Sequence, residues 1–369
     1  MKNNQWICLA LSLALSTQLA AQDSPLRIAV ISLTHGHVNW VFDSEARGDI
    51  EIIGIVEPDR NLAARYAAQH EFPMDKVYEC SEALLAEAGA KIEAVTAFGN
   101  IYDHLQVVET FAPRGIHVMV EKPLATTFAQ AKKMAALAEK NDIHLLTNYE
   151  TTWYPTNHLA YELIEEGKIG EIRKVVVRDG HRGPKKIGVS KEFFEWLTDP
   201  KLNGGGAIID FGCYGANLLT WLMQGERPNS VTAVTRQLQA ENNSKVDDEA
   251  IIILNYDDAV AIIQASWNWP IGRKDMEIYG LTGVVYADNR HDLRVRMAKG
   301  YDGFDEEKMT LEERPAPYND PFLYLTAVIR EEINPAPYDL SSLENNLLAM
   351  EILTAAVKSA QKGKTVKLK

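Results

Sequence analysis

The sequence predicts an α/β protein. Its N-terminal half is expected to be a Rossmann-type, doubly wound parallel sheet, and its C-terminal half an α+β domain with a large open antiparallel sheet. Three observations predict this class. In the first half, short β-branched apolar runs alternate with helical patterns, which is typical of a parallel sheet with helices on both faces. In the second half, closely spaced strand-like runs follow one another through short turns. The length of 369 residues suits two domains.

The first domain is expected over residues 25–148. Its strands are expected at 26–32, 50–56, 92–98, 116–120 and 143–147. Each run is too short for a helix and suits a strand buried on both faces. Helical patterns lie between them at 81–88, 103–112 and 128–141. Thr126 or Thr127 can cap the last of these helices.

The second domain, expected over residues 149–340, is interpreted as the substrate and oligomerisation domain. Its strands are expected at 172–178, 230–237, 249–256, 258–267, 275–280, 283–287 and 292–297. One helix is expected at 207–223. Residues 341–369 should form a final amphipathic helix and tail that pack back on both domains. Because an uncovered antiparallel face tends to be buried somewhere, we expect a homo-oligomer formed through this sheet.

Composition excludes several classes of protein. The 51 acidic residues outnumber the 38 basic residues, so the net charge is −13. A nucleic-acid partner is therefore not expected, since it would require a basic face. Residues 1–21 carry one lysine, a short apolar run and small residues up to Ala21, which predicts a secretory signal peptide. The run is too short to span a bilayer, so we expect an exported, periplasmic protein with no membrane partner.

The tripeptide Glu121-Lys122-Pro123 directly follows an expected strand. A lysine there would point from the carboxyl edge of the sheet into the cleft between the domains, where ligands bind in such folds. A partly desolvated lysine beside another charge can take part in proton transfer. The alternative is a surface ion pair ahead of a proline turn.

A second motif is NGGGAIIDFGCYG, residues 203–215, where three glycines lead into a helix. The glycines allow another backbone or a ligand to approach closely. Asp210 and Tyr214 are four residues apart, so they should share one helix face and could grip a diol. The alternative is a capped helix with a core tyrosine.

The first strand–turn–helix lacks the glycines of a dinucleotide fold. Such folds require G-x-G-x-x-G so that the pyrophosphate passes close to the backbone. Here Ser32, Thr34 and His37 occupy the three glycine positions. Glu57 ends the second strand, where an acid would hold the ribose hydroxyls, although a lone acid there is usually solvated. His35 and His37 form an H-x-H pair, but spacing identifies no third ligand, so we expect no metal.

Three features occur in one order in this chain: the EKP tripeptide, the GGG-x-x-x-D-x-G-x-Y segment, and an α/β half followed by an antiparallel half. Together they resemble the Gfo/Idh/MocA oxidoreductases. The similarity extends over nearly the whole mature chain. It implies a hydride transfer at a sugar hydroxyl, with Lys122, Asp210 and Tyr214 as the catalytic residues. The pKa of Tyr214 would then have to be lowered by the Lys122 cation for an efficient proton relay.

The resemblance also implies NAD, with NADP disfavoured because Glu57 would repel a 2′-phosphate. The implied cofactor-binding residues are Ser32, Thr34, His35, His37, Glu57, Asn100, His104, Glu121 and Lys122. Export separates the protein from free NAD, so we expect the cofactor to be tightly bound. The implied substrate is a small-molecule carbohydrate, and its expected contacts are Tyr149, Trp153, His181 and Lys185.

Two other functions stay open. One is a redox-neutral, NAD-dependent glycoside hydrolase or lyase that acts through a keto-sugar. The other is a sugar-binding protein that has lost its cofactor.

Overall fold

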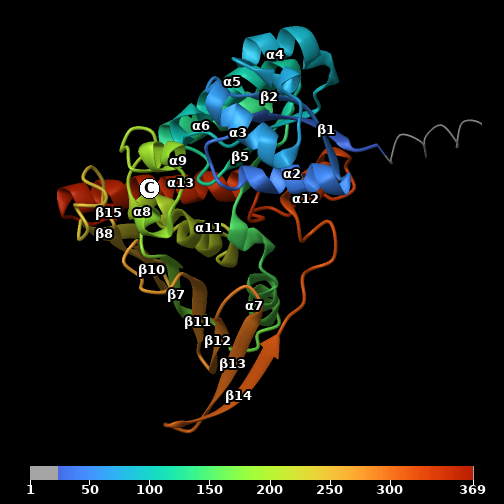
Figure 1. The fold of residues 1–369 in the computed structure, drawn as a ribbon. Coiled ribbons are helices and arrows are strands. Elements are labelled where there is room, and N and C mark those ends of the chain that lie inside the picture. Colours follow the sequence, from blue (N-terminus) through green and yellow to red (C-terminus); the bar gives the residue numbers. More distant parts are fainter. Residues whose placement is uncertain (1–23, 369) are drawn as a thin grey trace, which may run out of the picture.

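The computed structural model describes residues 24–368, which form two sheets with helices between and around them (Figure 1). The first sheet has six strands in the order β3-β2-β1-β4-β5-β6. They are β1 (Leu26–Ile31), β2 (Ile50–Val56), β3 (Val77–Tyr78), β4 (Ala94–Ala97), β5 (His117–Glu121) and β6 (Leu145–Asn148). All neighbours are parallel, which confirms the doubly wound sheet. Only β3 was not predicted, because two residues carry no pattern.

Helices cover both faces of this sheet. They are α2 (Val38–Arg47), α3 (Arg60–His70), α4 (Ser81–Ala88), α5 (His104–Phe111) and α6 (Phe128–Lys140). The α2 and α3 face is completed by α12 (Pro321–Ile329), whose Phe322 and Leu325 share a core with Leu26 and Ile28. Helix α12 was not predicted from the sequence. A segment from late in the chain thus closes the N-terminal core.

The second sheet has nine strands in the order β14-β13-β12-β11-β7-β10-β9-β8-β15. They are β7 (Ile172–Gly180), β8 (Ser230–Arg236), β9 (Glu249–Asn255), β10 (Val260–Ser266), β11 (Arg273–Gly280), β12 (Gly283–Ala287), β13 (Asp292–Lys299), β14 (Gly303–Thr310) and β15 (Val366–Lys367). The sheet is mixed rather than purely antiparallel, because β7 and β10 pair in parallel. A long connection that contains several helices separates β7 from β8. Both β8 and β10 are antiparallel to β9, so all three of β7, β8 and β10 run in one direction.

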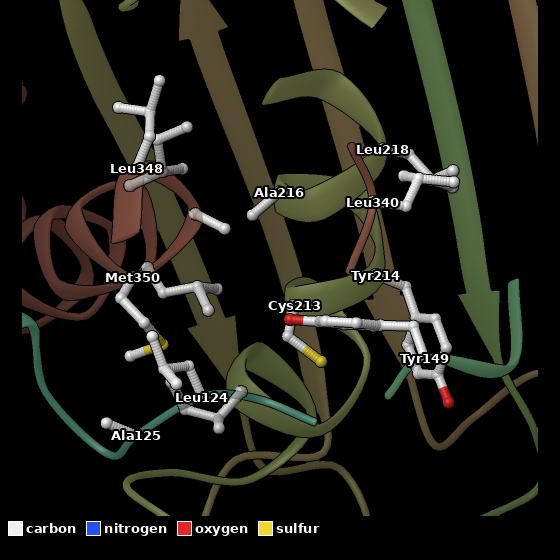
Figure 2. Packing of buried hydrophobic residues seen from close by; sticks show 14 of the residues in the cluster. Leu124, Ala125, Tyr149, Cys213, Tyr214, Ala216, Leu218, Leu340, Leu348 and Met350 are labelled. Carbon is white, nitrogen blue, oxygen red and sulfur yellow. The ribbon is translucent and has the colours of Figure 1, made fainter. Parts of the chain in front are cut away.

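One face of the second sheet is packed against helices. These include α10 (Ala207–Asp210), α11 (Gly212–Leu222) and α13 (Leu343–Lys362). The single helix expected at 207–223 is divided into α10 and α11, with the break at Phe211. Figure 2 shows Ala216 of α11 beside Leu348 and Met350 of α13. Because α13 also packs on α6, it joins the two halves.

The remaining helices are α7 (Pro155–Glu165), α8 (Pro184–Ile187) and α9 (Lys191–Leu197). The other face of the second sheet exposes Val234, Ile251 and Ile253, and oligomerisation through it stays a prediction.

The expected signal peptide lies outside the described residues. None of the helices within residues 24–368 is long and apolar enough to cross a membrane.

Candidate active site

Lys122 and Asp210 form a buried ion pair between the two halves. Lys122 follows the last residue of β5, and its side chain is 6% exposed. Its Nζ donates to Asp210 Oδ1 at 2.5 Å and to the Asp210 carbonyl at 3.0 Å. The other carboxylate oxygen accepts from Trp267 Nε1 at 2.9 Å. Both oxygens of Asp210 are thus held by donors.

The glycine run explains how Asp210 reaches this position. The Gly206 amide donates to Asp247 Oδ1 at 2.9 Å, and the Ala207 amide donates to the Asp247 carbonyl at 3.0 Å. A Cβ on Gly206 would lie 1.8 Å from that carbonyl oxygen. The close approach predicted for the glycines is therefore made by the Asp247 backbone. It anchors the start of α10, the helix that ends at Asp210.

A cavity of about 250 Å³ lies beside this ion pair. The sequence-predicted residues that line it are His35, His37, Lys122, His181, Asp210 and Tyr214. Lining residues that the sequence analysis missed include Glu150, Phe193, Phe211 and Lys274. The structure thus brings the three expected catalytic residues to one cavity, although they come from both halves of the chain.

Two ammonium groups flank the ring of Tyr214. Lys122 Nζ lies 5.2 Å and Lys274 Nζ 4.8 Å from its centroid. Lys274, near the start of β11, is paired with Glu150, which follows β6. Neither residue belongs to a recognisable motif, so no sequence signal could have identified them.

The electrostatics of the site keep the pair charged and the phenol neutral. Burial lowers the pKa of Lys122, but the charge and hydrogen bond of Asp210, together with Cys213 and Glu121, outweigh burial and raise the pKa above its usual value. Burial raises the pKa of Asp210, but Lys122, His181 and the hydrogen bond from Trp267 together outweigh burial and lower the pKa. Burial and the acid Glu150 raise the pKa of Tyr214 well above 10. The lowered pKa expected for Tyr214 is therefore wrong, because burial dominates over the nearby cations.

The expected substrate residues are dispersed. Only His181 lines the cavity, and it also borders a wider neighbouring cavity of about 590 Å³. Tyr149 is buried and packs its ring on Tyr214, with the centroids 5.4 Å apart. Trp153 lines a separate cavity of about 260 Å³ beside Trp40. Lys185 is exposed on the short helix α8, and its Nζ reaches the Glu241 carbonyl at 3.4 Å.

The first turn departs from a dinucleotide cradle. Ser32 keeps a left-handed backbone with φ 67°, but side chains occupy the turn. Trp196 of α9 donates to Thr34 Oγ1 at 3.1 Å. His35, only 3% exposed, packs against Phe193 of the same helix. Helix α9 thus lies over the turn along which a pyrophosphate would pass.

The expected ribose acid is not presented to a ligand either. Glu57 is 3% exposed, and its carboxylate accepts from the amides of Leu33 at 2.9 Å and Asp59 at 3.0 Å. Burial raises the pKa of Glu57, and the hydrogen bonds from these two amides offset part of that rise. The residues of the turn therefore do not fit the pyrophosphate and ribose of a dinucleotide as they stand.

Two further expected cofactor residues have structural partners. Asn100 caps the 3-10 turn Ile101–Asp103 by accepting from the Asp103 amide at 3.2 Å. His104 is 1% exposed, and its Nδ1 lies 3.1 Å from the Leu124 carbonyl. Neither residue lines the cavity beside Lys122.

Comparison with known proteins agrees with this fold. Residues 27–149 match the model of an oxidoreductase family with an NAD-binding Rossmann fold, and residues 158–286 match the model of the GFO/IDH/MocA C-terminal domain. The trans-1,2-dihydrobenzene-1,2-diol dehydrogenase of Xenopus tropicalis is 26% identical over 240 residues, which cover 64% of this chain and 67% of that enzyme. The D-xylose 1-dehydrogenase (NADP(+)) of Haloarcula marismortui is 28% identical over 270 residues, covering 73% of each chain.

Two solved structures share the overall fold. One is the aldose-aldose oxidoreductase from Caulobacter crescentus complexed with glycerol, with a TM-score of 0.76 and 23% identity over 93% of this chain and 100% of that one. The other is an inositol dehydrogenase homolog from Azotobacter vinelandii complexed with NAD+, with a TM-score of 0.80 and 17% identity over 94% and 98% of the two chains. Taken with the matches to both domain models, the chain belongs to the GFO/IDH/MocA family of NAD(P)-dependent oxidoreductases.

Proposed function

We propose that this protein acts on a hydroxyl-bearing carbon of a sugar or sugar derivative, with Lys122, Asp210 and Tyr214 controlling the proton of that hydroxyl. The observation that carries the proposal is the buried Lys122–Asp210 pair at the wall of a cavity shared with Tyr214. The sugar and diol dehydrogenases among the relatives support a substrate with hydroxyl groups.

The charge states suggest a role for each group. Because the pKa of Lys122 is raised, its ammonium stays protonated and would stabilise negative charge that develops on the substrate oxygen. Asp210, with a lowered pKa, would accept a hydrogen bond from a neighbouring hydroxyl. Tyr214 stays a neutral phenol and would donate a hydrogen bond rather than act as a base.

A dehydrogenase needs a hydride acceptor, which in the family is NAD(P). Tightly bound NAD is therefore part of this proposal as an expectation. Glu57 and the turn at residues 32–37 would have to rearrange to admit it. We also propose that residues 1–21 direct the chain to the periplasm.

A second candidate is a redox-neutral lyase or glycoside hydrolase that acts through a keto-sugar. The position of α9 over the turn favours it, since Trp196 and Phe193 would hinder exchange of a cofactor between cycles. Such an enzyme would use the same proton-handling groups but would not release a reduced cofactor. A sugar-binding protein without chemistry is the third candidate.

One set of assays separates these functions. The purified protein is denatured, and the supernatant is analysed for NAD and NADP by mass spectrometry. A panel of aldoses, polyols and diols is assayed for NADH formation with added NAD+, and nitrophenyl glycosides are assayed for cleavage without it. NADH formation supports the dehydrogenase, whereas glycoside cleavage alone supports the second candidate.

The Lys122→Ala variant is expected to lose activity at least 100-fold in whichever assay succeeds, because it removes the charge that stabilises the substrate oxygen. The control is Lys186→Ala, which removes an exposed lysine of α8 that does not line the cavity. Full activity in the Lys122→Ala variant would refute the role given to that lysine.

A further inference from the structure

We infer that His35, His37 and Glu121 form a binding site for one divalent transition-metal ion. One donor atom from each residue lies within 4.8 Å of the other two. His37 Nδ1 is 3.0 Å from Glu121 Oε2, and the two imidazole centroids are 4.4 Å apart. Two imidazoles and a carboxylate suit Zn²⁺, Fe²⁺ and related ions, whereas Mg²⁺ and Ca²⁺ prefer oxygen donors alone.

The fold explains why these residues meet. The turn after β1 and the end of β5 both lie at the carboxyl edge of the parallel sheet. Glycines in this turn would leave room for a pyrophosphate. In this chain the same turn carries two imidazoles that reach Glu121. His37, which stands at the third glycine position, and the nearby His35 thus supply two metal ligands from this turn.

Surrounding groups hold each ligand in place. Asn148 Nδ2 donates to Glu121 Oε1 at 2.6 Å, and Trp153 Nε1 donates to Asn148 Oδ1 at 3.1 Å. Because Oε1 of Glu121 accepts from Asn148, the other oxygen, Oε2, faces His37. The ring of Trp40 stacks on His37 with the centroids 4.0 Å apart. Outer hydrogen bonds of this kind orient the ligands of metal sites.

His35 has one nitrogen engaged and one without a partner among residues 24–368. Its Nδ1 accepts from the His37 amide at 3.1 Å. A neutral imidazole has a single acceptor nitrogen, and in His35 this nitrogen is Nδ1. A metal ion would therefore displace this hydrogen bond, either by binding Nδ1 or by binding Nε2 after the ring has rotated. The imidazole of His35 is therefore a direct reporter of metal binding.

The site would keep coordination positions open to a ligand. His35 and His37 line the same cavity as Lys122, Asp210 and Tyr214. Three protein ligands with an open position are typical of catalytic rather than structural metal sites. The ion would thus lie where it could polarise an oxygen of a sugar substrate. This inference does not depend on the proposed function, because metal binding is measured without substrate.

The test uses the full chain after treatment with a chelator. Zn²⁺ is titrated by isothermal calorimetry, Co²⁺ by its visible absorption, and bound metal is counted by elemental mass spectrometry. We expect one ion per chain. His37→Ala and Glu121→Gln should each weaken binding at least tenfold while retaining the native circular dichroism spectrum. In protein labelled with ¹⁵N at histidine, Zn²⁺ should shift the ring nitrogens of His35.

A second histidine pair provides a matched control. His117 and His144 also stack, and the His144 amide donates to His117 Nδ1 at 3.0 Å. His117→Ala should leave the affinity for Zn²⁺ unchanged. The inference is overturned if no ion binds, if binding survives both His37→Ala and Glu121→Gln, or if the purified chain carries one NAD and takes up no metal.

Discussion

At the scale of single residues, the site depends on how Asp210 is held. One carboxylate oxygen faces Lys122 and the other accepts from the buried indole of Trp267. The hydrogen bond from Trp267 is among the causes that lower the pKa of Asp210. Trp267 is fully buried, so it acts by positioning Asp210 rather than by touching substrate.

Trp267→Phe should therefore lower kcat about tenfold or more with a smaller change in KM, because a hydrogen bond to a charged group contributes about 1.5–3 kcal/mol. Losing this donor raises the pKa of Asp210, so the acidic limb of the pH–rate profile should move to higher pH. Trp269→Phe is the matched control, since Trp269 Nε1 is buried without a partner among the described residues. An unmoved acidic limb in Trp267→Phe would contradict the positioning role.

At the scale of elements, the placement of α10 depends on one glycine. The helix begins where Gly206 and Ala207 donate to Asp247, and it ends at Asp210. A side chain at Gly206 cannot be accommodated by a rotamer change, because the atom that it meets is a backbone oxygen 1.8 Å away.

Gly206→Ala is expected to lower the free energy of unfolding by about 3 kcal/mol, as overpacking does in well-packed regions, and to reduce activity by displacing Asp210. Urea titration gives the stability. Gly272→Ala is the control for stability, since its Cβ would meet no atom closer than 3.8 Å. If the two variants have the same free energy of unfolding, residues 203–206 shift to accommodate the added methyl group, and the prediction is contradicted.

At the scale of the whole molecule, buried histidines make stability depend on pH. Burial lowers the pKa of His104 to about 4 and that of His158 to about 3, from 6.5. The unfolded chain therefore binds more protons than the folded chain between these values and 6.5. Stability is then fully present above pH 6.5 and falls as the pH decreases through this range.

Between pH 6.5 and pH 5, each of these histidines should remove about 2 kcal/mol from the free energy of unfolding. Burial also lowers the pKa of His35 to about 3 and that of His117 to about 4, so urea titrations at pH 7.5, 6.5 and 5 measure the sum of these losses, and the difference between wild type and a single histidine variant isolates one of them. His104→Gln, which takes up no proton there, should give a flatter dependence. A wild-type stability that does not change over this window would contradict the prediction.

The limits of prediction from the sequence appear in particular elements. The residues of β14 are almost all exposed, so no apolar alternation identifies the strand. It pairs with β13 through contacts such as Arg296 Nε to Glu306 Oε1 at 2.7 Å. Helix α12 was missed although its sequence is apolar, because only its packing on the distant β1 core shows its place.

Local patterns in the sequence predict the two sheets, most of their strands and the motifs around Lys122 and Asp210, because periodicity, turn residues and short motifs are local properties of the chain. That Lys122 and Asp210 share one site is implied by the family resemblance, whereas only the tertiary structure shows their direct contact across 88 positions. It also shows that Lys274 and Glu150 line the same cavity and that Glu121 completes a cluster with His35 and His37. It also decided that burial keeps Tyr214 neutral. These outcomes depend on distances and desolvation between segments far apart in the chain, which no local pattern encodes.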